Sequence, residues 1–320
     1  MGPLSPKRFR DLGVLGMNRR NFELIHALNP RASYPLVDDK LRTKRLVRDH
    51  GICVPEVYCV IDRHHQLQDI ESRLEGRDDF VVKPARGAAG DGILVVERRL
   101  GGGSYRTASG KLKSIEDLRQ HLANILSGMY SLSAAPDRAF FEYRIKPDET
   151  LGKISFQGVP DVRVVVYRGY PAFSMVRLPT AMADGKANLH QGAVGAGVDI
   201  GTGKTSSGVW KRRRIREHPD TGCSIEGVEV PHWPRLLEIA AGCFDLIGMG
   251  YLGVDLVLDE DHGPMMLELN ARPGLDIQIA NRRGLREVLA KVDAFADEPR
   301  SPAERVDMAR SHLGDGAWPY

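Results

Sequence analysis

Two carboxylates in the C-terminal half of the chain are spaced to face each other across a β-hairpin. Between residues 253 and 270, two β-like runs flank the polar cluster DEDHGP, which is typical of a turn. If the turn is centred between Asp261 and His262, Asp255 lies six residues before it and Glu268 six after it. These two would then be cross-strand neighbours. Asn270 would share the face of Glu268, because side chains alternate along a strand.

Carboxylates that face each other repel, and burial would raise that cost. A hard cation that bridges them removes the conflict. Oxygen ligands of this kind suit Mg²⁺ or Mn²⁺, which usually complete their coordination with phosphate oxygens and water. The spacing therefore predicts a metal site at Asp255, Glu268 and Asn270, and the alternative is a solvated hairpin face without a metal.

A second group with chemical potential is the segment FVVKPARGAAGDG, where Lys83 lies on a predicted strand. The glycines that follow, Gly87, Gly90 and Gly92, would let backbone amides approach phosphates closely. The segment is not a Walker loop, because the GxxxxGK[ST] pattern is absent and a strand follows it. The segment GTGKTSS at 201–207 also lacks that pattern, and we interpret it as an ordinary turn or a substrate-side loop.

Helical and strand patterns surround both groups, so the sequence predicts an α+β fold. Helices are expected at 18–28, 38–50, 66–75, 114–126 and 234–247, and strands at 56–61, 80–85 and 93–97, with later strand pairs turning at Arg168-Gly169 and around 259–264. Residues 99–113 indicate a flexible hairpin, and the glycine-rich stretch 192–208 indicates a loop and hairpin region. The Pro and charge content after about Asp297 is typical of a loose end.

Composition limits the classes of partner. The chain has 320 residues with 45 basic and 42 acidic side chains, and a net charge of +3 does not favour nucleic acid. No apolar run resembles a signal peptide or approaches the ~18 residues of a membrane span, so we expect a cytoplasmic protein with no membrane partner. Its 4 cysteines are scattered and are expected to be reduced, structural thiols.

Six separated segments recur in the order that characterises the ATP-grasp superfamily, and the chain most resembles its RimK-like α-L-glutamate ligases. The segments are DKLRTKRLVRDHGICVP, VVKPARGAAGDG, FFEYRI, DVRVVVYRG, NLHQGA, and VDLVL with LELNARPG. The resemblance extends from about residue 38 to residue 290. It implies the ATP-grasp fold, in which two α+β subdomains clasp ATP. The expected divisions are a short N-terminal helical segment (1–38), the two subdomains (39–138 and 139–295) and a C-terminal tail (296–320).

The resemblance also implies roles for individual residues. Lys40 and Lys83 match the lysines that contact ATP phosphates, Gly87, Gly90 and Gly92 match the flexible loop that closes over them, and Glu142 with Tyr143 match the linker that holds adenine and ribose. Asp255, Glu268 and Asn270 match the metal ligands, and Arg163, Asn188 and Arg272 fall where the family places groups near the γ-phosphate and the acyl phosphate.

By resemblance, the chain is an ATP- and Mg²⁺-dependent (or Mn²⁺-dependent) carboxylate-amine ligase that works through an acyl phosphate. It would add glutamate or another amino acid to a carboxylate of a peptide, protein or small molecule, with release of ADP and phosphate. The alternatives are an ATP-grasp phosphotransferase and a catalytically inactive nucleotide-binding accessory module.

Three features of the sequence bear on the substrates without identifying them. Only 39 residues precede Lys40, whereas RimK-like ligases carry a preceding substrate-binding domain, so the N-terminal region is shortened and a homo-oligomer could cover the exposed surface. The basic run Lys211 to Arg216 is either a solvated hairpin or a dock for an acidic peptide or protein acceptor. His190 either assists deprotonation of the amine or is structural.

Overall fold

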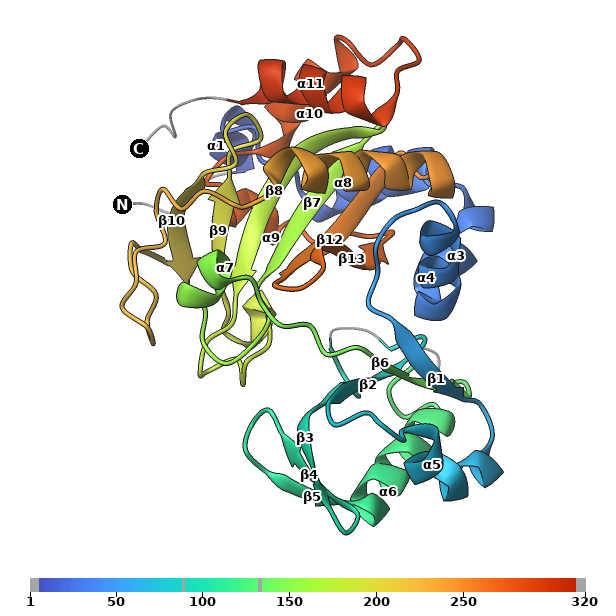
Figure 1. Ribbon diagram of the computed structural model, residues 1–320. Helices are drawn as coiled ribbons and strands as arrows, with labels where there is room; N and C mark the ends of the chain where they lie inside the picture. The colour runs from blue at the N-terminus through green and yellow to red at the C-terminus, as the bar shows by residue number, and fades with distance from the viewer. Residues whose placement is uncertain (1–5, 88–89, 132–133, 315–320) are drawn as a thin grey trace. The chain divides into compact units, whose positions relative to one another are not determined.

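The computed structural model describes residues 6–87, 90–131 and 134–314. The chain divides into two compact units, and each is built on its own antiparallel sheet (Figure 1). Unit 1 comprises Met1–Asp38, Arg42–Cys53 and Pro147–Tyr320, and unit 2 comprises Asp39–Leu41 and Val54–Lys146. The predicted α+β class is confirmed.

Unit 2 contains a six-stranded sheet in the order β1-β6-β2-β3-β4-β5. Its elements are β1 (Val57–Ile61), the 3-10 helix η3 (His64–Asp69), α5 (Ile70–Arg73), β2 (Phe80–Pro84), β3 (Leu94–Gly101), β4 (Ser104–Thr107), β5 (Leu112–Ser114), α6 (Ile115–Leu126) and β6 (Ala139–Glu142). Helix α6, predicted at 114–126, begins at a capping box in which the Ser114 side chain accepts from the Asp117 amide. Its buried residues Leu118, Leu122 and Ile125 join the core of the unit, so one face of the sheet is covered.

Two features of unit 2 differ from the sequence expectations. The segment 99–113, expected to be one flexible hairpin, forms the end of β3, all of β4 and the start of β5, which pair as a meander. Strand β6, expected to open the second subdomain at residue 139, instead pairs between β1 and β2. The unit therefore ends at Lys146 rather than at residue 138, because strand pairing holds 139–142 in its sheet.

Unit 1 contains a seven-stranded sheet in the order β11-β10-β9-β8-β7-β12-β13. Its strands are β7 (Asp161–Tyr167), β8 (Tyr170–Leu178), β9 (Val194–Val198), β10 (Thr205–Trp210), β11 (Arg213–Ile215), β12 (Tyr251–Asp259) and β13 (Gly263–Asn270). Its N-terminal helices are α1 (Pro6–Asp11), α2 (Met17–Arg19), the π-helix η1 (Arg20–His26), the 3-10 helix η2 (Arg31–Ser33), α3 (Tyr34–Asp38) and α4 (Lys40–Asp49), although Lys40 and Leu41 of α4 belong to unit 2. Its later helices are α7 (Glu149–Lys153), the 3-10 helix η4 (Leu189–Gln191), α8 (Trp233–Ile247), α9 (Asp276–Ala280), α10 (Leu285–Asp293) and α11 (Pro302–Leu313).

The C-terminal segment corrects the expectation of a loose end. Ser301 and Glu304 form a capping box at the start of α11, and Pro302 occupies the first turn, where its missing N–H costs nothing. Val306, Ala309 and Leu313 are buried, and α11 packs against α8 and β8 (Figure 1). The helix is therefore part of unit 1.

The N-terminal segment is also integrated into unit 1. The Asn29 side chain donates to the carbonyls of Tyr251 (2.8 Å) and Ala271 (3.0 Å) and accepts from the amide of Tyr251 (3.0 Å). Residues 42–53, expected to belong to the first subdomain, cluster with unit 1 as well. All 4 cysteines are free, as expected, and burial raises the pKa of Cys59 to about 11 and that of Cys243 to about 12. Within the described ranges, no helix combines the length and apolarity needed to cross a membrane.

Candidate functional site

Three ionisable side chains lie in a row across neighbouring strands of unit 1. In the centre, Asp255 of β12 is opposite Arg163 of β7 on one side and opposite Glu268 of β13 on the other. Residues directly opposite in adjacent strands project from the same face of a sheet. The predicted pairing of Asp255 with Glu268 is therefore confirmed, and Arg163 extends the pair into a row.

A β-bulge sets this register. Near the turn, Asp259 pairs with Gly263, and an uninterrupted ladder from there would place Leu267 opposite Asp255. The register shifts between Asp255 and Leu256, which brings Glu268 opposite Asp255 instead. Asn270 then lies on the same face, where its amide nitrogen donates to Asp255 Oδ2 (3.1 Å) and approaches Glu268 Oε1 (3.5 Å).

Arg163 holds Asp255 through two hydrogen bonds. Its Nε lies 2.6 Å from Asp255 Oδ1, and its Nη2 lies 2.5 Å from Asp255 Oδ2. This forked arrangement is the strongest way in which an arginine pairs with a carboxylate. Asp255 is completely buried, so the pair also offsets the cost of removing its charge from water.

A second arginine, which the sequence interpretation missed, completes the cluster. Arg177 of β8 makes a forked pair with Asp161 of β7 (2.6 Å for both bonds) and also donates to Asp255 Oδ2 (2.9 Å). The signal lay in the cross-strand register, because Asp161 and Arg177 are opposite each other in the β7–β8 hairpin that turns at Arg168-Gly169.

The arginines decide the ionisation of the buried acids. Burial alone raises the pKa of Asp255, but Arg163 and Arg177 override it and hold this pKa at about 2. Burial raises the pKa of Asp161 to about 6, against the opposing effect of Arg177 and with a further contribution from the charge of Asp255. Burial lowers the pKa of Arg177, but Asp161 and Asp255 together raise it above its ordinary value. Asp255 therefore stays a carboxylate at neutral pH.

The donor set of this cluster fits Mg²⁺. Asp255 and Glu268 supply hard oxygen ligands side by side, and Asn270 bridges them with an amide whose oxygen could also serve. Across the described part of the chain, no group of three or more His, Cys, Asp or Glu side chains is arranged to hold a metal. A cation here would consequently draw its other ligands from phosphate oxygens and water, as Mg²⁺ usually does.

In unit 2, the predicted residues Lys83 and Glu142 form one buried ion pair. Val81 of β2 is opposite Glu142 of β6, so Lys83, two residues along, is the diagonal neighbour of Glu142 on the same face. The Nζ of Lys83 lies 2.5 Å from Oε1 of Glu142, and the side chains are only 11% and 1% exposed. The opposite face of β2 contributes Phe80 and Val82 to the core, which fixes the orientation of Lys83.

Lys40 lies at the glycine-rich loop. Its Nζ donates to the carbonyl of Gly87 (2.6 Å), and its backbone amide donates to the carbonyl of Ala85 (2.9 Å). A Cβ on Gly87 would lie 2.2 Å from Pro84, so only glycine fits there. Residues 88 and 89 of this loop lie outside the described part.

The carboxyl end of this loop is packed as well. A Cβ on Gly92 would lie 2.7 Å from the ring of Tyr130, and φ of Gly92 is +74°. The carbonyl of Gly92 is hydrogen-bonded to Nε2 of His121 (3.0 Å). Gly90 has a φ of +80° but would meet no atom within 4 Å, so its conformation alone favours glycine.

The structure places the remaining predicted residues in other surroundings. The backbone N–H of Tyr143 donates to the backbone carbonyl of Glu56 (2.8 Å), which ties Tyr143 to the segment before β1. The side-chain oxygen of Asn188 accepts from the His190 amide (3.0 Å) and caps η4. The guanidinium of Arg272 stacks on the ring of Tyr34 (4.4 Å to the ring centroid).

The side chains of His190 and Arg272 are exposed. The side chain of His190 is 82% exposed and lies 3.3 Å from a carboxylate oxygen of Asp276. The guanidinium of Arg272 lies 3.6 Å from Asp38, with both side chains 54% exposed. The assigned roles of Asn188 and Arg272 therefore stay predictions.

Unit 2 has a further charged cluster that the sequence interpretation did not select. Asp39, which is buried, accepts from Nη2 of Arg138 (2.6 Å) and lies 3.6 Å from Nε of Arg86. Arg86 directly precedes Gly87 and is half exposed, so it adds positive charge at the start of the glycine-rich loop.

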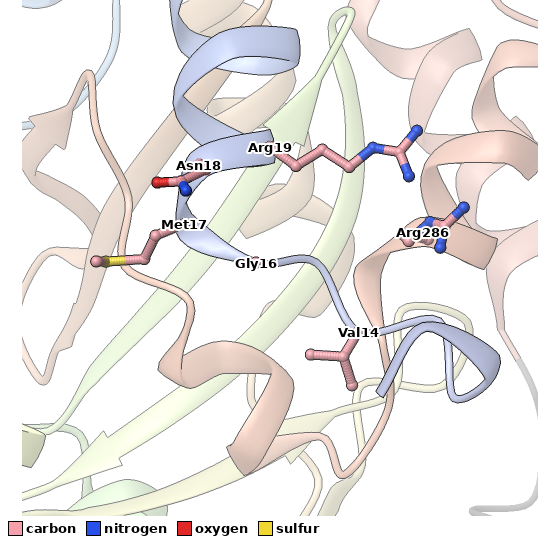
Figure 2. A pocket seen from close by; sticks show the side chains of 6 residues that line it. All are labelled: Val14, Gly16, Met17, Asn18, Arg19 and Arg286. Atoms are coloured by element: carbon pink, nitrogen blue, oxygen red, sulfur yellow. The ribbon is translucent and has the colours of Figure 1, made fainter. Parts of the chain in front are cut away.

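A pocket of about 730 Å³ lies elsewhere in unit 1, beside the first helices. Figure 2 shows its lining residues, with Arg19 on α2 extending toward Arg286 of α10. The remaining lining residues are Val14, Gly16, Met17 and Asn18. None of the residues predicted to do chemistry contributes to it.

The chain belongs to the sugar-transfer associated ATP-grasp family, whose model matches residues 19–294. The ATP-grasp resemblance drawn from the ordered segments is thereby confirmed, and ATP binding follows from the fold.

Curated relatives carry the name that the RimK-like resemblance implied. The chain is 24% identical over 261 residues to a probable alpha-L-glutamate ligase of Maridesulfovibrio salexigens, covering 80% of this chain and 64% of that protein. It is 24% identical over 300 residues to a probable alpha-L-glutamate ligase of Trichodesmium erythraeum, covering 92% and 74%. The chain thus spans less than two thirds of the first of these relatives.

Among solved structures, D-alanine–D-alanine ligase from Bacillus anthracis in complex with ATP matches with a TM-score of 0.44 at 14% identity, covering 88% of this chain and 68% of that one.

Proposed function

We propose that this chain is an ATP- and Mg²⁺-dependent carboxylate-amine ligase. It activates a carboxylate as an acyl phosphate, joins it to an amine, and releases ADP and phosphate. The observation that carries the proposal is the row of Arg163, Asp255 and Glu268, in a chain that belongs to an ATP-grasp family. The names of the curated relatives support glutamate or a similar amino acid as one substrate.

In unit 1, the side chains of the cluster divide the work. Asp255, Glu268 and Asn270 hold the cation, which when bound neutralises charge on the phosphate oxygens. Arg163 supplies a positive charge for the phosphoryl group that is transferred, where charge stabilisation matters most. Asp255 binds the cation as a carboxylate, because its pKa of about 2 keeps it ionised.

In unit 2, Lys40 and Lys83 neutralise phosphate charge on ATP. Lys83 is held in position by Glu142, and Lys40 by the Gly87 carbonyl. The loop that contains Gly87, Gly90 and Gly92 excludes water that would hydrolyse an acyl phosphate. Positioning and electrostatics therefore carry the reaction, and no nucleophilic side chain is needed.

The turn between β10 and β11 supports an acidic peptide or protein as acceptor. The exposed residues are Lys211 and Arg212 in the turn and Arg213 and Arg214 at the start of β11. The indole N–H of Trp210 donates to the carbonyl of Gly192 (2.8 Å), which ties this basic hairpin to the end of η4. A guanidinium-rich surface favours carboxylates, because each arginine can bind one through two hydrogen bonds.

The Glu268→Gln variant tests the reaction most directly. It removes one ligand charge without exposing a buried group, and we expect a loss of ATP turnover of about 100-fold or more. Release of ADP would be measured with single amino acids and with acidic and neutral peptides as substrates, followed by mass spectrometry of the product. Glu238→Gln, an identical change at the exposed Arg235–Glu238 pair of α8, is the matched control.

The outcomes separate the candidate functions. A ligase consumes an amine and releases phosphate, whereas a phosphotransferase leaves the γ-phosphate on its acceptor. Turnover retained in Glu268→Gln with a normal metal requirement would exclude the metal site. Absence of turnover with every substrate, together with intact nucleotide binding, would favour the accessory module.

A further inference from the structure

The two arginines that bind Asp255 are anchored differently. The side chain of Arg177 makes two hydrogen bonds to Asp161 as well as one to Asp255. Within the described residues, the side-chain hydrogen bonds of Arg163 all go to Asp255. Both arginine side chains are 13% exposed, so the number of carboxylate partners, not burial, distinguishes them.

Asp255 has little remaining capacity to accept another ligand. Its Oδ2 accepts from Arg163, Arg177 and Asn270, and its Oδ1 accepts from Arg163. Each oxygen of an ionised carboxylate offers about two lone pairs, so Oδ2 with its three donors has none left, whereas Oδ1 keeps one. A cation that binds Oδ2, the oxygen that Asn270 links to Glu268, must therefore displace at least one donor.

We propose that Arg163 is the donor that leaves, so that Arg163 and a divalent cation exchange at Asp255 while Arg177 remains in place. Arg163 is the only donor to Oδ1, and it has no second carboxylate that retains it among the described residues. Arg177 keeps its two bonds to Asp161 even if its bond to Asp255 is lost. Asp161 is accordingly a positioning residue, because it acts on the site through Arg177. This inference rests on the proposed function, since it takes the cation site as given.

Charge balance favours the exchange. Asp161 and Asp255 bring two negative charges, and Arg163 and Arg177 bring two positive ones, so the charges of these four side chains balance. A divalent cation added to this neutral set would leave positive charge unbalanced in a largely buried environment, where it is costly. When Arg163 turns away, that excess falls by one charge, and its guanidinium becomes available to a phosphate. One event thus loads the cation and frees the arginine.

The exchange predicts a variant that loses activity but gains metal affinity. Binding of Mn²⁺, without nucleotide, would be measured by electron paramagnetic resonance on the full chain for wild type, Arg163→Gln and Arg163→Lys. Removing the forked pair should strengthen Mn²⁺ binding by about tenfold in Arg163→Gln. Arg163→Lys retains the charge but cannot form the fork, so exchange predicts an intermediate gain, whereas simple charge repulsion predicts wild-type affinity.

A surface control removes the same charge from the same hairpin. Arg168→Gln acts at the β7–β8 turn, where Arg168 pairs with Asp293 and Asp297, and it should leave Mn²⁺ affinity unchanged. Unchanged or weaker Mn²⁺ binding in Arg163→Gln would overturn the exchange, as would a Lys variant equal to wild type.

Different results would exclude the cation site and the exchange of Arg163. If wild type binds no Mn²⁺ even with ADP present, the cation site fails, and the proposed function fails with it. If wild type binds Mn²⁺ and Glu268→Gln abolishes this binding, the site stands, and only the Arg163 result decides the exchange.

Discussion

The two units each bury a carboxylate on a sheet, but they balance its charge differently. In unit 2, the buried carboxylate of Glu142 holds Lys83 in a close ion pair. In unit 1, Asp255 binds both Arg163 and Arg177, Arg177 also binds Asp161, and Asn270 adds a further donor to Asp255. When one arginine leaves Asp255, the other remains as its partner. The unit 1 arrangement is therefore suited to ligand exchange, and the unit 2 arrangement to holding a lysine in one place.

The largest expected effect comes from breaking the unit 2 pair. Lys83→Met removes the positive charge beside the buried carboxylate of Glu142, which should cost about 3–5 kcal/mol of stability. Asp161→Asn in unit 1 leaves Arg177 paired with Asp255, so its cost should be smaller, about 1–3 kcal/mol. Hydrogen exchange of the β2 and β6 amides for the first variant, and of the β7 and β8 amides for the second, would measure each cost within its own unit.

The double variant Lys83→Met/Glu142→Leu provides the internal control. Because it removes both charges, much of the stability lost in Lys83→Met should return. Equal costs for Lys83→Met and Asp161→Asn would mean that the network gives no extra tolerance, and the contrast between the two units would be lost.

The sequence predicted the elements whose determinants are local. The symmetric spacing around the turn gave the pairing of Asp255 with Glu268, and the capping residue Ser114 gave the start of α6. The pairing of Asp255 was reached without its bulge, because equal spacing on either side of the turn happens to match the shifted register. Local signals thus predicted that Asp255 and Glu268 face each other.

Other features depend on contacts between distant segments. The position of β6 between β1 and β2 and the placement of Arg177 beside two acids both follow from strand order, which alternation within one strand does not reveal. Helix α11 was a different failure. The sequence Ser301-Pro302-Ala303-Glu304 contains the capping box that begins this helix, but the Pro and charge content around it is typical of a loose end.

An intermediate effect would test how firmly the glycine-rich loop of unit 2 is packed. Gly92→Ala combines a left-handed backbone with contact against Tyr130, whereas Gly90→Ala has the same backbone requirement in open space. We expect Gly92→Ala to be less stable than Gly90→Ala by about 1–3 kcal/mol, the usual cost of overpacking. Thermal unfolding of both variants would check this, and equal stabilities would mean that Tyr130 yields without cost.

The smallest effect contrasts an exposed arginine of unit 1 with the buried Arg163. Arg272 stacks on Tyr34 and pairs loosely with Asp38, and such exposed contacts contribute under about 1 kcal/mol. Arg272→Ala should therefore change stability and turnover little, with less than a tenfold loss of turnover. Asp38→Asn, which removes the ion pair but keeps the guanidinium, is the matched control. A loss of turnover well beyond tenfold in Arg272→Ala, but not in Asp38→Asn, would instead mean that the guanidinium leaves Tyr34 to act on the phosphates.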